Sequence, residues 1–370
     1  MRPSDAAFAV VWAYLGAALT GKLIYSDILG KPLVAPAVYA VVFLLTVMAS
    51  YVLWGKSNSM IRWREALYLG LTLLFLIPLG PVYFLAGIPA MGLAIWLLRK
   101  AVFLGRARRI GIIGGVIAVA LFSIGIVAFG VPLMKPWLRY TVASVPFLAA
   151  GDVLIIAIGA YPSPWLMLLG LVIAIVGASR TVGIGVLTAY ILAEAYGGIS
   201  LRAFVKKKSL LILTIFLFAA MLLARYWVTR HLYPDWSLGL IGTLFYRVGS
   251  TYTVYEHLFE WGMPFGNHIL LFQSDPTGYV GHLFGRDVGY TYSLFGQPAY
   301  DFGIIGIVEA VFLGVLLREA DRSAVTGTFA FTLLVLMTEI GIEGAFLSAL
   351  SYAAFLGIKF DMGDAGWRKR

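Results

Sequence analysis

Apolar residues in this chain fall into long runs that recur from near the first residue to near the last. A run of roughly twenty apolar residues is long enough to cross the hydrocarbon core of a bilayer as a helix. The pattern therefore predicts an all-α, polytopic membrane protein with about twelve transmembrane helices. The expected spans are residues 6–25, 33–54, 65–79, 82–98, 110–131, 141–160, 165–178, 182–196, 209–224, 302–317, 325–340 and 344–358.

Two regions of this pattern are ambiguous. The runs within 65–98 and 165–196 are interrupted by Pro, Gly or polar residues. Each region is either a pair of short spans or one broken or re-entrant element. No repeat of fixed period and no soluble segment stands out, so residues 1–370 are expected to form a single membrane domain.

Composition supports the membrane interpretation and narrows the chemistry. Hydrophobic residues make up 61% of the chain and charged residues 12%, whereas soluble domains carry about a quarter charged residues. The absence of cysteine excludes disulfides, thiol catalysis and thiolate metal sites. The formal charge of +10 is explained by basic residues at cytoplasmic helix ends, so no nucleic-acid partner is expected.

Basic clusters predict the orientation in the membrane. Under the positive-inside rule, the densest clusters lie in the cytoplasm. Counting through the expected spans returns every cluster to that side and places both termini there. We therefore expect a multi-pass protein of the plasma or inner membrane. The two densest clusters are Arg99, Lys100, Arg106, Arg108 and Arg109, and Arg202, Lys206, Lys207 and Lys208.

Residues 225–300 form the one long connection between expected spans, and the count places them on the outer face. The loop holds every histidine of the chain and several arginines and aromatics, but no lysine. Segments 239–247 and 252–261 predict short amphipathic helices on the bilayer surface. The ionisable side chains of interest are His231, His257, His268, His282, Arg225, Arg230, Arg247 and Arg286.

This composition indicates a sugar–phosphate ligand. The planar fork of arginine binds phosphate oxygens in pairs and keeps its charge in a partly dry site. Aromatic rings such as Tyr290 stack on the C–H faces of sugars. The competing interpretation is an interfacial belt in which aromatics and arginines contact lipid headgroups, and for any single aromatic it is the favoured one. The four histidines lack a metal-binding spacing, so no metal is expected.

A second signal lies at Arg180, where two short apolar segments meet among small residues. A charge within membrane-embedded sequence is costly and usually faces a cavity or a partner. A plain tight turn is the alternative, and we favour a substrate-facing role. Glu339 and Glu343 bracket a short outer turn and are expected to face the loop. Asp301 opens the span after the loop, as a helix N-cap or as a catalytic carboxylate.

Two stretches carry a family resemblance. Residues 177–181, Gly-Ala-Ser-Arg-Thr, resemble the small-Ser-Arg element of the oligosaccharide repeat-unit polymerases of the O-antigen polymerase type, which include archaeal members. The stretch that begins at Arg247 and runs to 289–306 is similar to the end of the large external loop in that family. One position departs from the pattern, because Gln297 stands where a glutamate is expected.

The resemblance implies a GT-C-like membrane glycosyltransferase without a cofactor. It would transfer a glycan from a polyprenyl- or dolichyl-(pyro)phosphate carrier to a second lipid-linked unit on the outer face. Membrane lipids and flippase or chain-length proteins are the implied partners. The base candidates for the acceptor hydroxyl are His268, His282 and Asp301. The candidate substrate-binding residues are Arg180, Arg225, Arg230, Arg247, Arg286 and Tyr290.

Three alternatives remain open at the level of sequence. A ligase of the O-antigen ligase type would use the same donor and a different acceptor. A transporter or flippase would be expected to show matched halves with broken spans, which are absent here. A structural membrane subunit would not explain an arginine- and histidine-rich outer loop.

Overall fold

The computed structural model describes residues 2–54, 61–81, 91–92, 107–135, 137–138, 141–197 and 208–360. Regular structure within these ranges is entirely helical, as the sequence predicted. Helices at Pro3–Ile24, Val34–Leu53, Ala107–Phe129, Ile212–Leu232 and Ser293–Ala320 are long and apolar enough to cross a membrane. The fold is therefore that of a polytopic helical membrane protein. The number of about twelve spans stays a prediction.

The helices divide between two compact units. The described part of the first unit is mainly residues 107–243, and that of the second is mainly residues 8–92 and 244–360. Whether the chain acts as a single membrane domain stays a prediction. The first unit contains α6 (Ala107–Phe129), η3 (Val142–Ser144), α7 (Val145–Ala160), α8 (Pro164–Val176), α9 (Arg180–Tyr196) and α11 (Lys208–Leu232).

The second unit contains most of α1 and α12 and all of the remaining described helices. Its helices are α1 (Pro3–Ile24), α2 (Ser26–Leu29), α3 (Val34–Leu53), α4 (Ile61–Leu76), η1 (Ile77–Leu79), α12 (Leu240–Gly262), η4 (Leu270–Phe272), α13 (Pro276–Leu283), α14 (Ser293–Phe302), η5 (Gly303–Gly306), α15 (Ile307–Ala320), α16 (Ala324–Ile340) and α17 (Gly344–Lys359).

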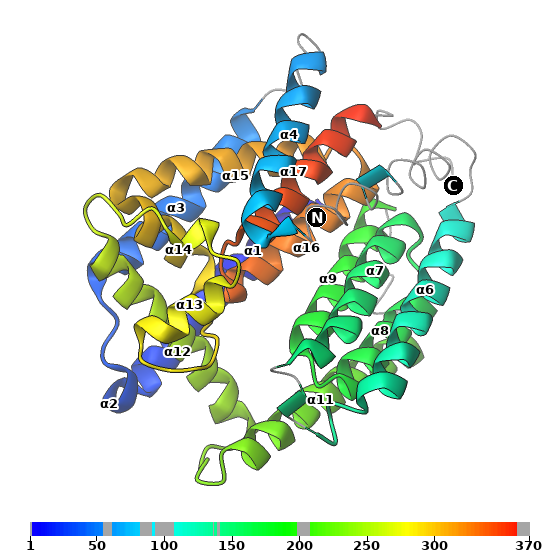
Figure 1. The fold of residues 1–370 in the computed structure, drawn as a ribbon, viewed down its shortest axis with the longest axis horizontal. Helices are drawn as coiled ribbons and strands as arrows, with labels where there is room; N and C mark the ends of the chain where they lie inside the picture. The colour runs from blue at the N-terminus through cyan, green and yellow to red at the C-terminus, as the bar shows by residue number, and fades with distance from the viewer. Residues whose placement is uncertain are drawn as a thin grey trace. The chain divides into compact units, whose positions relative to one another are not determined.

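Small residues let the helices of the first unit pack closely, and Figure 1 shows α6, α7, α8 and α9 side by side. A Cβ on Gly151 would meet Val182 at 2.7 Å, and one on Gly170 would meet Val186 at 2.6 Å. Such contacts are typical of membrane helices, which associate through small residues. The ambiguous region 165–196 is therefore a pair of helices, α8 and α9, and not one broken helix.

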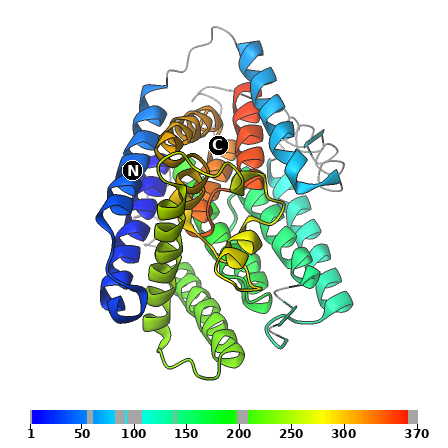
Figure 2. The ribbon, with the colours of Figure 1, turned by 60° about the vertical axis from the view of Figure 1, so that its left-hand side comes forward.

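In the second unit, α12 packs along α1 (Figure 2). Gly249 of α12 lies against the backbone of α1, where a Cβ would meet Lys22 N at 2.9 Å. The buried Lys22 forms an ion pair with the buried Glu256, which also accepts the Leu33 N–H at 2.7 Å. These contacts fix one flank of the expected outer loop on the N-terminal helices.

Two expectations for the loop were wrong in detail. Segments 239–247 and 252–261 do not form separate helices, because α12 is continuous over 23 residues. The intervening Gly249 lies within this continuous helix at a point of close approach to α1. In addition, α11 extends to Leu232, so Arg225 and Arg230 are helical. The expected span 82–98 lies outside the described residues except at 91–92.

Candidate functional site

Arg180 is the first residue of α9 and follows a tight turn. The Gly177 N–H donates to Ile173 O at 2.8 Å, and the Ser179 N–H donates to Ala174 O at 2.9 Å. Ala178 has φ 48°, in the left-handed region. The Ser179 hydroxyl then caps α9 by accepting the Val182 N–H at 3.4 Å. The turn is therefore tight, as the alternative interpretation of the sequence had it, and it places Arg180 at a helix N-terminus, where anions are favoured. The substrate-facing role of Arg180 stays a prediction.

Arg225 lies on α11, a helix that contacts α9. Gly183 of α9 contacts the buried Met221 of α11. Arg180 is about one turn before Gly183, and Arg225 is about one turn after Met221. Within the described residues, Arg225 Nη1 is buried without a hydrogen-bond partner.

The arginine at the C-terminal end of α11 differs from Arg225 in its exposure. Arg230 is exposed, with Nη1 3.4 Å from the Tyr226 hydroxyl, which donates to Leu238 O at 3.0 Å. Trp227 and His231 stack with their ring centroids 5.4 Å apart. An exposed arginine among stacked rings fits the interfacial belt better than a built site. The substrate-binding role of Arg230 stays a prediction.

In the second unit, Asp301 lies in the last turn of α14 and so does not cap the start of its own helix. Its side chain is fully buried. The carboxylate accepts the N–H groups of Ile269, Leu270 and Leu271 at 3.1, 2.6 and 2.7 Å. It also accepts the Gln297 amide at 3.0 Å. Asp301 therefore caps η4, a helix thirty residues earlier in the chain.

Asp301 and its neighbour also hold His268 by the backbone. The His268 N–H donates to Asp301 O at 2.9 Å, and the Asn267 N–H donates to Tyr300 O at 2.9 Å. His268 itself has φ 59°. Its ring is exposed and lies 5.7 Å from the Phe302 ring, centroid to centroid. The structure thus joins two predicted residues into one arrangement, with Asp301 as the anchor and His268 as the accessible group.

The other predicted residues of the second unit lie on the loop surface or beside its core. His282 in α13 is exposed, with Nδ1 3.6 Å from the exposed Asp287. Arg286 is exposed and is bound through its N–H to Gly281 O at 3.0 Å. Arg247 is half-buried in α12. Tyr290 packs against the buried cluster that includes Val254, Leu258, Leu270 and Tyr292, which we call the loop core. Arg180, Arg225 and Arg230 belong to the first unit, so the predicted site residues are divided between the two units.

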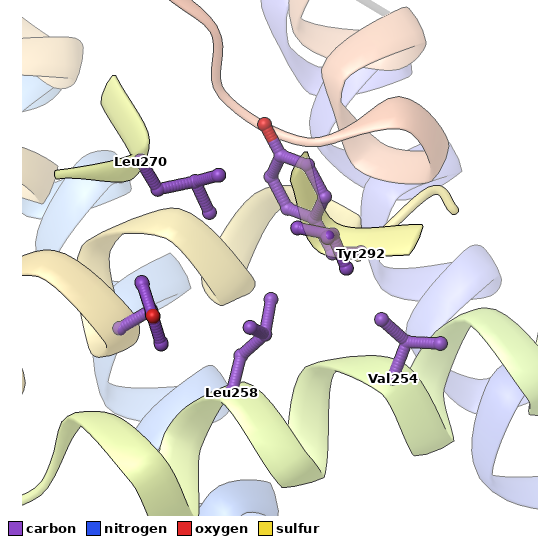
Figure 3. Close-up of a cluster of buried hydrophobic side chains, with 6 residues drawn as sticks. Val254, Leu258, Leu270 and Tyr292 are labelled. Atoms are coloured by element: carbon purple, nitrogen blue, oxygen red, sulfur yellow. The ribbon is translucent and has the colours of Figure 1, made fainter. Parts of the chain in front are cut away.

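The loop core binds the turn between α16 and α17. Tyr292, Leu270, Val254 and Leu258 are buried together (Figure 3). The Tyr292 hydroxyl donates to Ile342 O at 2.9 Å, and the Tyr292 N–H donates to Ile340 O at 3.1 Å. Glu343 directly follows Ile342, whose carbonyl accepts the Tyr292 hydroxyl, and its facing the same cavity as the loop stays a prediction. Burial, with a further effect from Asp275, raises the pKa of Glu343 to about 7.

Sequence reasoning missed Glu309, in the first turn of α15. It lines an apolar cavity of about 330 Å³ with Phe75, Phe302 and Phe312. Among the described residues, neither oxygen of Glu309 has a hydrogen-bond partner, and both are buried. A carboxylate in the middle of the expected apolar span 302–317 was the available signal. In the same ranges, no group of three His, Asp or Glu side chains is arranged to hold a metal ion.

Comparison with known proteins identifies the family. No curated protein and no solved structure matches the chain significantly. A family model described as "Putative O-antigen polymerase" matches residues 28–355, which is most of the chain. The match includes both units and the turn at Arg180. It supports a membrane protein of glycan polymerisation with lipid-linked oligosaccharide substrates. The chain belongs to the O-antigen polymerase family.

Proposed function

We propose that the protein is a glycosyltransferase that polymerises lipid-linked oligosaccharide repeat units on the outer face of the membrane. Arg180 and Arg225 bind the (pyro)phosphate of the polyprenyl carrier. The observation that carries this proposal is that Arg225 Nη1 is buried without a hydrogen-bond partner in the described part of the chain, on a helix that contacts α9 at Gly183, about one turn from Arg180. A buried donor without a partner is costly, and a ligand acceptor would satisfy it.

The same pair explains how the bond to the carrier would be activated. Negative charge grows on the pyrophosphate as it leaves the sugar. Fixed cations at that point stabilise the transition state more than the ground state. Two arginines and the N-terminus of α9 provide such a field without reorganisation. Arginine suits this role better than lysine because its fork binds two phosphate oxygens together.

His268 is the proposed base for the acceptor hydroxyl. Its ring is exposed, while its backbone is fixed by Asp301. The carboxylate of Asp301 already accepts four hydrogen bonds. An acceptor with its lone pairs engaged is poorly placed to take a further proton, so Asp301 is proposed to position the base. His282 remains an alternative base.

The test is a reconstituted assay with a lipid-linked oligosaccharide and separation of the products by size. Wild type is expected to form a ladder of longer lipid-linked glycans. Arg180→Lys and Arg225→Lys should each reduce it on the order of a hundredfold, because the paired phosphate contacts are lost. Arg109→Lys, at an exposed position of α6, is the matched control and should remain active.

Two results would overturn the proposal. Full ladder formation by both site variants would remove the arginines from the mechanism. A wild-type protein that transfers a single glycan to another acceptor, without a ladder, would be a ligase.

A further inference from the structure

Four aromatic rings of the expected outer loop lie in contact and form one surface, which we call the aromatic platform. Its members are His257, Trp261, Phe284 and Tyr290. His257 and Trp261 of α12 stack with their ring centroids 5.8 Å apart. The Phe284 ring, at the C-terminal end of α13, lies 5.5 Å from His257 and 5.2 Å from Trp261. Tyr290 lies 5.6 Å from Phe284, so Phe284 joins the rings of α12 to a later segment of the chain.

The aromatic platform is fixed on one side and open on the other. Phe284 and Tyr290 pack against the loop core, which limits the movement of both rings. Trp261 is 44% exposed, and the side chain of His257 is 45% exposed. A contiguous cluster of exposed rings on a folded protein marks a binding surface, because its apolar area would otherwise stay in water.

The platform is joined to the segment that carries His268. Asn267 Nδ2 donates to Trp261 O at 3.1 Å. The Asn267 N–H donates to Tyr300 O at 2.9 Å, beside the bond from the His268 N–H to Asp301 O. Asn267 directly precedes His268 in the chain. The Trp261 end of the platform is therefore one hydrogen bond and one residue away from the proposed base.

Polar side chains border the platform. Glu260 is exposed, and its Oε2 lies 3.7 Å from Nδ1 of His257. His282 and Asp287, on either side of Phe284 in the chain, are exposed with Nδ1 and Oδ1 3.6 Å apart. Carboxylates accept hydrogen bonds, and a neutral imidazole both donates and accepts. A sugar is complementary to such a surface, since it has C–H groups on its faces and hydroxyl groups around its edge.

We propose that the aromatic platform binds the sugar rings of the acceptor glycan. The negative face of each aromatic ring attracts the weakly positive C–H groups of a sugar, and the bordering carboxylates accept hydrogen bonds from its hydroxyl groups. This inference rests on the proposed function, because it takes the platform as the acceptor subsite beside His268.

The competing occupant of the platform is the bilayer interface, where aromatic residues also gather. The exposed carboxylates of Glu260 and Asp287 favour the glycan. A carboxylate is costly in contact with the hydrocarbon of a bilayer, and segments that lie on a membrane surface carry mainly Lys and Arg on their polar face.

Trp227 provides a matched control for Trp261. It stacks on a histidine four residues away, as Trp261 does, with the Trp227 and His231 ring centroids 5.4 Å apart. Its exposure is also similar, at 48%. The Trp227 pair lies on α11 in the first unit, beside the exposed Arg230, where the arrangement fits the interfacial belt.

The first measurement is saturation-transfer NMR on the full-length protein in lipid nanodiscs. The probe is the lipid-free oligosaccharide released from the lipid-linked substrate, so binding is read without turnover and without a lipid anchor. Irradiation of aromatic protons should transfer saturation to the sugar C–H protons in the wild type. Trp261→Ala should reduce this transfer about fivefold or more, whereas Trp261→Phe keeps a ring and should stay within about twofold of wild type. Trp227→Ala should equal wild type.

The second measurement is the rate of ladder formation as a function of the concentration of lipid-linked oligosaccharide. Trp261→Ala should raise KM about tenfold and leave kcat within about twofold of wild type. The reason is that stacking on the sugar is lost equally from the ground state and the transition state. Trp261→Phe should restore most of the loss in KM.

The outcomes separate this inference from the proposed function. If saturation transfer is present and is lost in Trp261→Ala, but the wild type forms no ladder, the polymerase proposal fails and the glycan-binding platform stands. If the wild type shows no transfer, or if Trp261→Ala and Trp227→Ala behave alike, the inference is overturned while the polymerase proposal is unaffected. A fall in kcat at unchanged KM in Trp261→Ala would also overturn it.

A fluorescence measurement tests the bilayer as the occupant. The contribution of Trp261 is the difference in emission between the wild type and Trp261→Phe. In vesicles of phosphatidylcholine brominated in its acyl chains, this contribution should be quenched no more than in unbrominated vesicles. Strong quenching would place the ring in the hydrocarbon and overturn the inference.

Discussion

Each end of α15 carries a glutamate, but only one of the two is paired with cations in the described part of the chain. Glu319, in the last turn, is fully buried and meets Arg64 at 2.9 Å, Trp54 Nε1 at 2.7 Å and the buried Arg322. Glu309, in the first turn, has buried oxygens without a partner in the described residues and lines an apolar cavity. A buried carboxylate surrounded by cations is compensated, and removing it would leave buried positive charges without a partner carboxylate. A buried carboxyl without a cation is a candidate for function.

The largest expected effect on stability comes from removing Glu319, the glutamate that is paired with arginines. Glu319→Ala leaves Arg64 and Arg322 without their carboxylate, and removing one partner of a buried ion pair costs about 3–5 kcal/mol. Thermal unfolding of the purified protein in detergent measures the change. Asp287→Ala, at a fully exposed side chain, is the matched control and should unfold as wild type does. If Glu319→Ala were as stable as the control, the comparison between the two ends would lose its basis.

A smaller effect on stability is expected from replacing Asp301, which lies close to Glu309. Asp301→Ala leaves three backbone N–H groups and the Gln297 amide without an acceptor, at a cost of about 2–4 kcal/mol. Asp301→Asn keeps one oxygen and should lose about half of that. Denaturant unfolding gives the stability, and ladder formation should fall in the same order. An alanine variant that unfolds like wild type but forms no ladder would instead indicate direct catalysis by Asp301.

The smallest effect is a pH dependence at Glu343, which has a nearby anion, Asp275, as its neighbour. The pKa of Glu343 is raised from 4.5 to about 7. The stability linked to its protonation is therefore present below about pH 4.5 and is lost as the pH rises through about 7. Glu343→Gln should be about 1–2 kcal/mol more stabilising at pH 8 than at pH 5. Urea unfolding at the two pH values tests this.

Asp275→Asn sharpens the Glu343 prediction. Asp275 caps α13 by accepting the Gly278 N–H at 2.9 Å, and asparagine caps as well as aspartate does. The variant therefore removes the charge and keeps the cap. It should reduce the pH dependence without lowering stability at pH 5. An unchanged pH dependence would show that burial alone raises the pKa of Glu343.

The sequence predicted the parts of the structure that depend on local pattern. The helices at α1, α3, α6 and α7 agree with the expected spans, because bilayer thickness sets the length of each apolar run. The turn at Arg180 was one of two interpretations of the sequence and not the favoured one, and it rests on small residues and a charge between two apolar segments. Hydropathy did not predict the continuity of α12 or the close approach of its Gly249 to α1.

The candidate site was likewise only partly predictable from the sequence. The sequence by itself determined an all-helical membrane protein, the arginines of the loop and the residues that carry the family resemblance. Only the tertiary structure decided that Asp301 anchors the His268 segment. It also decided that, among the described residues, Arg225 Nη1 and the Glu309 oxygens are buried without a hydrogen-bond partner. Hydropathy is a property of neighbouring residues. Hydrogen bonds, charge pairing and burial depend on groups that are far apart in sequence and meet only when the chain folds.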